Sequence, residues 1–261
     1  MEISRVGDGE VYLIAGGGKI YTDIAARFTS TEKSVPEIIG TPYSKKIVDN
    51  ILTRGHYNAT EFDWFIFGIE KFARVTEVQL VRKRHGSYLI KSGRQELKGK
   101  RKYSLVLPKN SKLDSLITEF TLENGQVINV SMMDYLKLGE AVYNAGMEYG
   151  IAEEDLRYLK PQATEFKAIV GMNARCLNEF FNMRCCQRAQ AEIRDLAYKM
   201  LRLAKEAKPD LFTNSGPSCK SLGYCPENDA QCDLYKGKIP TKNDVKEALN
   251  QFFYNNASLD D

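Results

Sequence analysis

The stretch R-C-C-Q-R-A-Q-A-E-I-R-D-L-A-Y-K-M-L-R-L-A-K, from Arg184 to Lys205, has the clearest structural pattern in the chain. Its apolar residues recur at intervals of three and four, and the opposite face is charged, which is typical of an amphipathic helix packed on a core. Pro209 is expected to close the helix. The apolar stripe consists of Ile193, Leu196, Ala197, Met200, Leu203 and Ala204.

Segments on the N-terminal side of this helix predict strands. The run F-D-W-F-I-F-G-I, from Phe62 to Ile69, is aromatic and β-branched, which favours a strand buried on at least one face. Residues Val11 to Ala15 alternate and then meet a glycine-rich turn, whose spacing lacks the G-x-x-x-x-G-K-S/T pattern of a phosphate-binding loop. Tyr103 to Leu107 is predicted to form a further strand.

Other segments carry helical patterns. Apolar residues recur at helical spacing in most of them, and in the last a Thr followed by Asp three positions later resembles a capping box. From about Lys112 onward, helical periodicity dominates. The predicted helices lie within Ser44 to Thr53, Phe72 to Leu80, Leu136 to Gly150, and Thr241 to Phe252.

The composition is that of an ordinary folded protein: 261 residues, 43% apolar, 10% aromatic and 27% charged. This length allows one large domain or two modest ones. Because no internal repeat or low-complexity linker divides the chain, we expect one α+β domain over residues 1–210 and a C-terminal extension over residues 211–261.

The net charge of +3 is too small to indicate a nucleic-acid or membrane partner, but the charges are unevenly distributed. The segment Arg82 to Lys102 holds nine basic residues and one acid, so it carries +8 and the remaining 240 residues carry −5. Many such runs are only solvated loops. In this run Ser87, Ser92 and Gly93 stand among the arginines, which suits a phosphate monoester.

Sequence features also bear on compartment and metals. No apolar stretch approaches the roughly 20 residues needed to span a bilayer, and the N-terminus lacks a signal-peptide layout, so we expect a cytoplasmic protein whose cysteines are thiols. Cys219, Cys225 and Cys232 offer three ligands for zinc or an iron–sulfur centre. Because a C-x2-C pair and a nearby His are missing, no metal site is predicted.

Few residues offer acid–base or nucleophilic chemistry. The chain has two histidines, and the sequences G-x-S-x-G, H-E-x-x-H and G-x-G-x-x-G are absent. Arginine is the remaining residue type that could serve a functional site, because its guanidinium binds phosphate and polarises carbonyl oxygens. Generic motifs therefore indicate only a candidate anion site.

A resemblance to the flavin-dependent thymidylate synthases adds to this interpretation. The segment Arg82 to Gln95 resembles the family signature R-H-R-x-x-S-x-N-E-x-S-x-R-Y, with matches at Arg82, Arg84, Ser87, Ser92 and Arg94 and departures at Lys83, Leu89, Ile90 and Gln95. The stretch Asn173 to Ala197 is closer still to the second family block. G-H-Y-N-A-T-E (Gly55 to Glu61) and A-A-R-F-T (Ala25 to Thr29) also match.

The resemblance implies a fold, an activity and site residues. The expected fold is α+β, an antiparallel sheet flanked by helices, with a Cys-bearing extension. The positions that match nucleotide-binding residues are Gln79, Arg82, Ser92, Gly93, Arg94, Arg157 and Arg184. Those that match residues around the flavin are Thr29, His56, Asn58, Glu61, Arg84, Asn173, Arg175 and Arg188, with Asn58 in place of a family Thr and Arg188 in place of a His. By the same resemblance Arg184 contacts and polarises the uracil ring, and Arg184 and His56 are the candidate catalytic residues.

Simpler interpretations stand beside these roles. Arg184 and Arg188 also suit a solvated helix face, and His56 suits a local backbone cap. Glu192 and Arg194 fit surface charges or a subunit contact.

The family activity is C5 methylation of dUMP to dTMP with FAD, NADPH and methylenetetrahydrofolate, in a homotetramer. Leu89 and Ile90 cannot accept the hydrogen bonds of the Asn and Glu they replace, so the nucleotide differs from dUMP or neighbours such as Lys91 or His85 rebuild the site. The alternatives are a divergent paralogue acting on another pyrimidine nucleotide, and a non-catalytic protein that binds nucleic acid through the basic segment.

Overall fold

The computed structural model describes residues 1–92, 102–109 and 111–255. The chain divides into two compact units. Unit 1 consists of residues 1–11 and 68–170, and unit 2 consists of residues 12–67 and the chain from residue 171 onward. Among the helices of the described part, none combines the length and the apolar character that crossing a bilayer requires.

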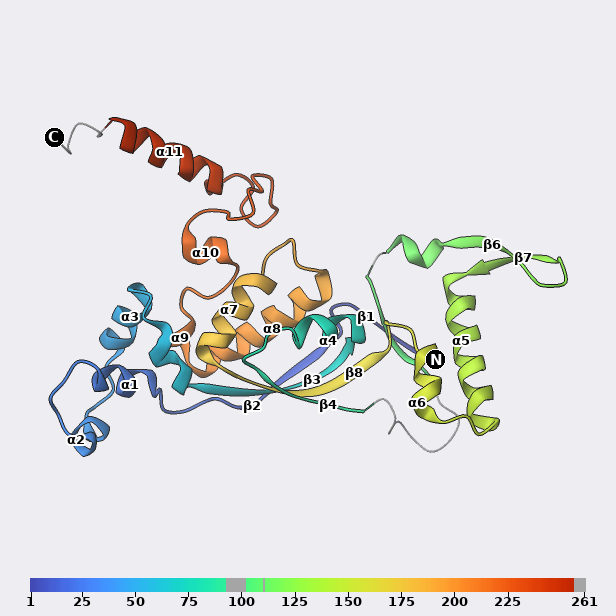
Figure 1. The fold of residues 1–261 in the computed structure, drawn as a ribbon, viewed down its shortest axis with the longest axis horizontal. Coiled ribbons are helices and arrows are strands. Elements are labelled where there is room, and N and C mark those ends of the chain that lie inside the picture. Colours follow the sequence, from blue (N-terminus) through green and yellow to red (C-terminus); the bar gives the residue numbers. More distant parts are fainter. Residues whose placement is uncertain (93–101, 110, 256–261) are drawn as a thin grey trace. The chain divides into compact units, whose positions relative to one another are not determined.

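A four-stranded sheet has the strand order β2-β3-β8-β4 (Figure 1). Phe65, Phe67 and Ile69 of β3 are buried because alternate side chains of a strand point to one face. The strands predicted from the aromatic run and from the N-terminal alternation are confirmed, whereas β4 is an unpredicted strand inside the cationic segment. The strands are β2 (Glu10–Ala15), β3 (Trp64–Ala73), β8 (Glu165–Asn173) and β4 (Ser87–Ile90).

A tyrosine pair lies in the core of unit 1. The rings of Tyr103 and Tyr143 meet edge to face with centroids 5.8 Å apart, and both side chains are buried. Leu105 and Leu136 belong to the same cluster. The surrounding elements are β1 (Glu2–Arg5), which pairs in parallel with β5 (Ser104–Leu107), then α4 (Arg74–Leu80), η2 (Lys112–Ser115), α5 (Met132–Glu148), α6 (Glu153–Leu156) and η3 (Arg157–Leu159).

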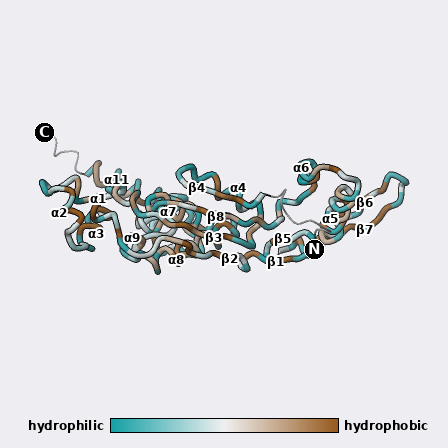
Figure 2. The backbone as a smooth tube through the Cα atoms, turned by 90° about the horizontal axis from the view of Figure 1, so that it is seen from below, coloured by the Kyte–Doolittle hydropathy of each residue, from teal (hydrophilic) through white to brown (hydrophobic). Residues whose placement is uncertain are grey.

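An antiparallel hairpin of β6 (Ile117–Thr121) and β7 (Val127–Ser131) stands where mainly helices were predicted, so that prediction is wrong for this segment. Asn124 and Gly125 occupy its turn, and Gly125 has a φ of 83°, which glycine adopts without strain. An Asn-Gly pair between alternating apolar runs is the sequence signal of such a turn. In Figure 2 the tube of this hairpin includes brown, hydrophobic stretches, although Ile117 is 64% exposed.

The helix predicted from Arg184 to Lys205 is confirmed from Ala191 onward, but its predicted start is wrong. Helix α7 (Ala174–Arg184) ends at Arg184, and α8 (Ala191–Ala207) carries the predicted apolar stripe, most of it buried. Gln190 caps α8 through its side-chain oxygen, which accepts a hydrogen bond from the Ile193 amide. Residues 185–190 therefore form a loop between the two helices.

The remaining elements of unit 2 are short, except for the last helix. These elements are α1 (Thr22–Phe28), α2 (Val35–Gly40), α3 (Lys45–Thr53), η1 (Tyr57–Phe62), α9 (Pro209–Phe212), α10 (Ser218–Leu222) and α11 (Lys242–Asn255). Helix α3 confirms the predicted helix, with Val48 and Ile51 buried.

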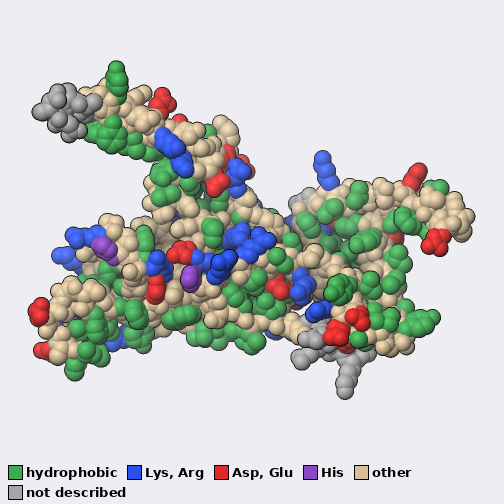
Figure 3. Space-filling model, in the orientation of Figure 1, with side chains coloured by type: hydrophobic (Ala, Val, Ile, Leu, Met, Phe, Trp, Pro, Cys, Tyr) green, Lys and Arg blue, Asp and Glu red, His purple; other side chains and the backbone are tan. Residues whose placement is uncertain are grey.

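Helix α11 begins as its sequence predicts. The Thr241 amide donates to the Asp244 carboxylate at 2.7 Å, and the Asp244 amide donates to the Thr241 hydroxyl at 3.2 Å. No residue of α11 is buried. Phe252 is 60% exposed, and Figure 3 shows hydrophobic side chains of this helix on the surface at the upper left.

A buried ion pair lies in unit 2. The Lys208 ammonium donates to the Asp63 carboxylate at 2.6 Å, with the two side chains only 3% and 0% exposed. Asp63 also accepts hydrogen bonds from the Tyr21 and Thr22 amides and from the Thr22 hydroxyl. Its backbone oxygen accepts from the Ala174 amide at 2.8 Å. Asp63 thus joins the starts of α1 and α7 to the residue that follows α8.

Candidate functional site

A cavity of about 590 Å³ in unit 1 gathers cationic side chains. It brings together Ser92 and Arg157, two of the residues expected to bind a nucleotide, although 65 positions separate them in the sequence. We call it the Arg157 cavity. Its other lining residues are Arg74, Glu77, Ile90, Lys91, Tyr158, Lys160, Pro161 and Gln162.

The start of the basic segment is fixed by Tyr88. Its hydroxyl donates to the backbone oxygens of Lys83 and Leu80, at 2.6 and 3.1 Å, which holds the turns before β4. At the other end of β4, the Lys91 amide donates to the Lys167 oxygen at 2.8 Å. These bonds place Ser92 just beyond the strand, at the cavity wall.

Glu77 of α4 is a carboxylate in the wall of this cavity. One of its oxygens lies 3.5 Å from the Arg74 guanidinium, and the other is buried without a hydrogen-bond partner in the described residues. Burial raises the pKa of Glu77, and the charge of Arg74 opposes the shift. A buried carboxylate oxygen without a donor can accept a hydrogen bond from a ligand.

Glu77→Gln is expected to stabilise the protein near neutral pH. Because the pKa of Glu77 is raised by folding, the stability that its protonated form contributes is present below the unfolded pKa and is lost as the pH rises through the folded pKa. The Gln variant should lack this loss. Urea unfolding between pH 4 and 7 measures it, and an equal pH dependence in both proteins would contradict the assignment.

Of the residues expected around the nucleotide, the other ones that the structure describes do not line the Arg157 cavity. The Gln79 side chain donates to the Val75 oxygen of its own helix at 3.4 Å. Arg82 and Arg84 are exposed in the turns before β4, as is His85, whereas Lys91, the other candidate replacement, does line the cavity. Gly93 and Arg94, with Gln95, lie outside the described residues.

In unit 2, three residues expected near the flavin form one polar network. Arg175, near the start of α7, donates to the side chains of Asn58 at 2.6 Å and Glu61 at 2.7 Å, and both of these stand on η1. Glu179, one turn further along α7, accepts from the same guanidinium at 3.3 Å. The hydrogen bond to Glu61 is the main cause of a raised pKa of Arg175.

Three further residues of that set make local contacts. The Asn173 side chain caps α7 by accepting from the Cys176 amide at 2.8 Å. The Thr29 hydroxyl donates to the Ala26 oxygen at the end of α1. His56 precedes η1 and is exposed; its side chain makes no capping hydrogen bond, so the simple capping interpretation finds no support.

Arg184 stands at the end of α7, where a cation is favoured by the helix dipole. The following loop is held by Arg194 of α8, whose guanidinium donates to the backbone oxygens of Gln187 at 2.7 Å and Ala189 at 3.1 Å. Arg194 is therefore a positioning residue and not a free surface charge. Exposed Arg188 lies 3.5 Å from the Glu227 carboxylate.

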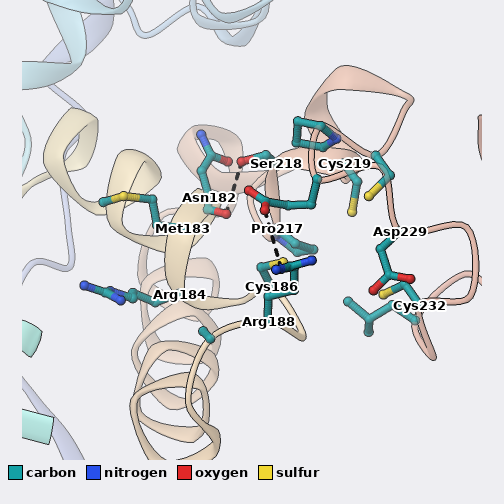
Figure 4. Close-up of a pocket in the computed structure, with 15 residues that line it drawn as sticks. Asn182, Met183, Arg184, Cys186, Arg188, Pro217, Ser218, Cys219, Asp229 and Cys232 are labelled. Carbon is teal, nitrogen blue, oxygen red and sulfur yellow. Dashed lines mark hydrogen bonds and ion pairs between the residues drawn. The ribbon is translucent and has the colours of Figure 1, made fainter. Parts of the chain in front are cut away.

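A second cavity, of about 350 Å³, lies between this loop and the segment after α9 (Figure 4). We call it the thiol cavity, because Cys186, Cys219, Cys225 and Cys232 all line it. In Figure 4 the Arg184 side chain extends away from these cysteines.

All six cysteines are free thiols. Burial raises the pKa of Cys185 to about 12. Burial is also the main cause of a raised pKa of Cys219, and the charges of Cys225, Cys186 and Cys232 raise it further. Among the described residues, no three His, Cys, Asp or Glu side chains already converge on a point where they could hold a metal ion.

Comparison with known proteins identifies relatives of the chain. The family model described as thymidylate synthase complementing protein matches residues 19–210. A flavin-dependent thymidylate synthase from Geobacter sulfurreducens is 38% identical over 185 residues, which cover 71% of this chain and 75% of the relative. That from Pyrococcus abyssi is 37% identical over 191 residues, covering 71% and 74%.

Solved structures share the fold. The UMP/dUMP methylase PolB from Streptomyces cacaoi, bound with 5-Br dUMP, superposes with a TM-score of 0.64 at 18% identity, covering 83% of this chain and 98% of that one. Its complex with 5-Br UMP gives 0.59 at 19% identity, covering 80% and 95%. The expected α+β fold with an antiparallel sheet is confirmed. From the family match over residues 19–210 and the identity to curated members, the chain belongs to the flavin-dependent thymidylate synthase family.

Proposed function

We propose that the protein methylates C5 of a uracil nucleotide, converting dUMP to dTMP, with methylenetetrahydrofolate as carbon donor, NADPH as reductant and FAD as cofactor. The proposal rests on the family match together with one observation: the Arg157 cavity joins Ser92 and Arg157, both matched to nucleotide-binding positions, among further cations. We further propose a cytoplasmic homotetramer, with residues 1–210 as the family domain and residues 211–261 as an extension.

The Arg157 cavity suits the nucleotide's phosphate. A guanidinium and a hydroxyl form charge-assisted hydrogen bonds to phosphate oxygens, and the neighbouring ammonium groups of Lys91 and Lys160 add positive potential. Gly93 and Arg94 are proposed to complete the phosphate contacts.

Arg184 is assigned to the uracil ring. C5 becomes nucleophilic when the ring is polarised toward an enolate-like form with negative charge on its carbonyl oxygens, and a fixed guanidinium stabilises that charge. Arginine stays protonated at every working pH, so this role needs no proton transfer to the protein. No protein nucleophile is needed.

The residues proposed for FAD fit that group in kind. Arg175 offers a guanidinium that is 40% exposed, suited to a pyrophosphate, and Asn58 and Glu61 hold it in place from η1. His56 and Arg188 are exposed, and Thr29, Arg84 and Asn173 are assigned by the match alone. Bound FAD supplies the reducing equivalents for the reaction.

Arg157→Ala is expected to weaken dUMP binding about 10- to 150-fold, because one charge-assisted hydrogen bond contributes about 1.5–3 kcal/mol. Equilibrium dialysis with labelled dUMP measures the change. The control is Arg54→Ala, which removes an exposed arginine at the end of α3. Equal affinities in the two variants would refute the phosphate assignment.

The proposed reaction is tested by tritium release from dUMP labelled at C5, with FAD, NADPH and methylenetetrahydrofolate present and UMP as the comparison. Folate-dependent release from dUMP supports the proposal. A protein that FAD cannot reconstitute, and that releases no tritium from either nucleotide, would overturn it and favour the non-catalytic alternative.

One feature favours a paralogue that modifies another uracil nucleotide as the second candidate. Ile90 lines the Arg157 cavity at the position where the family signature has Glu, so an acceptor is lost there. Glu77, with its unpartnered oxygen in the same wall, offers an acceptor in a different place. Bound flavin with turnover of UMP and none of dUMP would support this candidate.

A further inference from the structure

The segment from Ser218 to Pro240 lacks an apolar core of its own. Its only buried residues are Cys219 and Cys225, at 9% and 8% exposure, and its larger apolar side chains, such as Leu222, are exposed. A stretch of this length without a hydrophobic core is usually held by disulfides or a metal. The six cysteines of the chain are free.

Four cysteines share one local arrangement around the thiol cavity. Each begins a turn, because the backbone oxygens of Cys186, Cys219, Cys225 and Cys232 accept hydrogen bonds from amides three or four residues onward, at 2.7 to 3.4 Å. The partners are Ala189, Gly223, Asn228, Tyr235 and Lys236. Figure 4 shows Cys186, Cys219 and Cys232 around the same space.

The fourth thiol comes from outside the segment. Cys186 belongs to the loop between α7 and α8, two residues after Arg184, and supplies the ligand that the C-x5-C-x6-C pattern lacks. We propose that Cys186, Cys219, Cys225 and Cys232 form a four-thiolate metal centre, occupied by an iron–sulfur cluster, that fastens the C-terminal extension to the Arg184 loop.

The four thiols line a cavity of about 350 Å³, which leaves room between them for a cluster as well as for a single ion. Zinc bonds of about 2.3 Å would bring four sulfur atoms to about 3.8 Å from one another in a tetrahedron. No three metal-binding side chains of the described residues are gathered for a single ion. In a four-iron cluster each thiolate binds a different iron atom, so the ligands stand further apart than around one ion, and this is the cluster type that we assign to the cavity.

The surroundings support a metal-bound thiolate. Tyr235 lines a further small cavity together with Cys219, Cys225 and Cys232, and a tyrosine hydroxyl beside a metal-bound thiolate can donate a hydrogen bond to it. The Cys225 amide and oxygen are both paired, with the Pro240 oxygen at 2.8 Å and the Lys242 amide at 2.9 Å, which fixes this turn before α11.

The test is the metal content of the full chain, purified without oxygen and with no added metal. Iron and acid-labile sulfide in equal amounts near one cluster per chain, with a paramagnetic signal after dithionite reduction that flavin does not give, would support the proposal. Zinc near one per chain would support the four-thiolate site and overturn the cluster. If iron and zinc are each below 0.1 mol per mol of chain, or if fresh protein contains these thiols as disulfides, the proposed site is overturned.

Variants assign the ligands. Cys186→Ser and Cys232→Ser replace half-buried side chains, so folding should persist while metal falls at least fivefold. The matched control is Cys185→Ala, which removes the adjacent thiol buried away from the cavity and should retain the metal. Loss of metal should also speed protease cleavage within residues 213–241. Unchanged metal in both Ser variants would refute the assignment, and none of these measurements depends on nucleotide turnover.

Discussion

Arg184→Ala is expected to lower kcat/KM for the nucleotide about 100- to 1,000-fold, the loss typical of removing one donor that stabilises charge in a transition state. The effect should be large because the only other arginine of the α7–α8 loop, Arg188, lies against Glu227. The fold should be intact, because Arg184 is half-buried at a helix end and the core side chains of α7 remain.

Tritium release gives the rate, and flavin absorbance and circular dichroism report on the fold. Arg184→Lys keeps the charge without the planar fork and should recover only part of the activity. Arg202→Ala, which removes an exposed arginine of α8, is the control and should be near wild type. If Arg184→Ala keeps more than one third of the control's rate, its assignment to the uracil ring is wrong.

Lys208→Met is expected to destabilise the protein by about 3–5 kcal/mol, because it leaves the Asp63 carboxylate buried without its counter-ion. Marginal stabilities of about 5–15 kcal/mol make this a large fraction of the total. The Tyr21 and Phe65 rings, 5.6 and 5.5 Å from the ammonium, lose a cation–π contact as well.

Urea denaturation followed by circular dichroism measures the change. The matched control is Lys45→Met, which breaks ion pairs of an exposed ammonium with Asp49 and Asp210, and it should cost much less stability because water screens these charges. Comparable losses in the two variants would mean that the buried pair contributes no more than a surface one.

The sequence pattern correctly predicted those elements that depend only on interactions between residues close together in the chain. The stripe on α8, the alternation in β2 and the cap of α11 need only neighbouring residues, and all three were found. The loop after Arg184 is held by hydrogen bonds from the Arg194 guanidinium to two of its backbone oxygens. Helical periodicity in the sequence does not reveal such contacts. The Asn124-Gly125 turn was readable in the sequence but was outweighed by the helical pattern around it.

The candidate site depended on residues far apart in the chain. Ser92 and Arg157 were paired through the family resemblance, and the structure then placed both in one cavity. Glu77 gave no sequence signal, because an isolated Glu in a short helix is ordinarily a surface charge. In the sequence Cys186 is not distinguishable from its neighbour Cys185. In the folded chain Cys186 lines the thiol cavity, whereas Cys185 is buried outside it.

The Asp63–Lys208 pair has a consequence for how the protein is made. The two residues are 145 positions apart, so at about 5–20 residues per second the ribosome adds Lys208 roughly 7–30 s after Asp63. Throughout that interval the carboxylate has no counter-ion and should stay in water, which keeps the aromatic strand that follows it from docking prematurely. A nascent chain stalled before Lys208 should therefore be cut readily by protease around Asp63, and one extended well past Lys208 should resist.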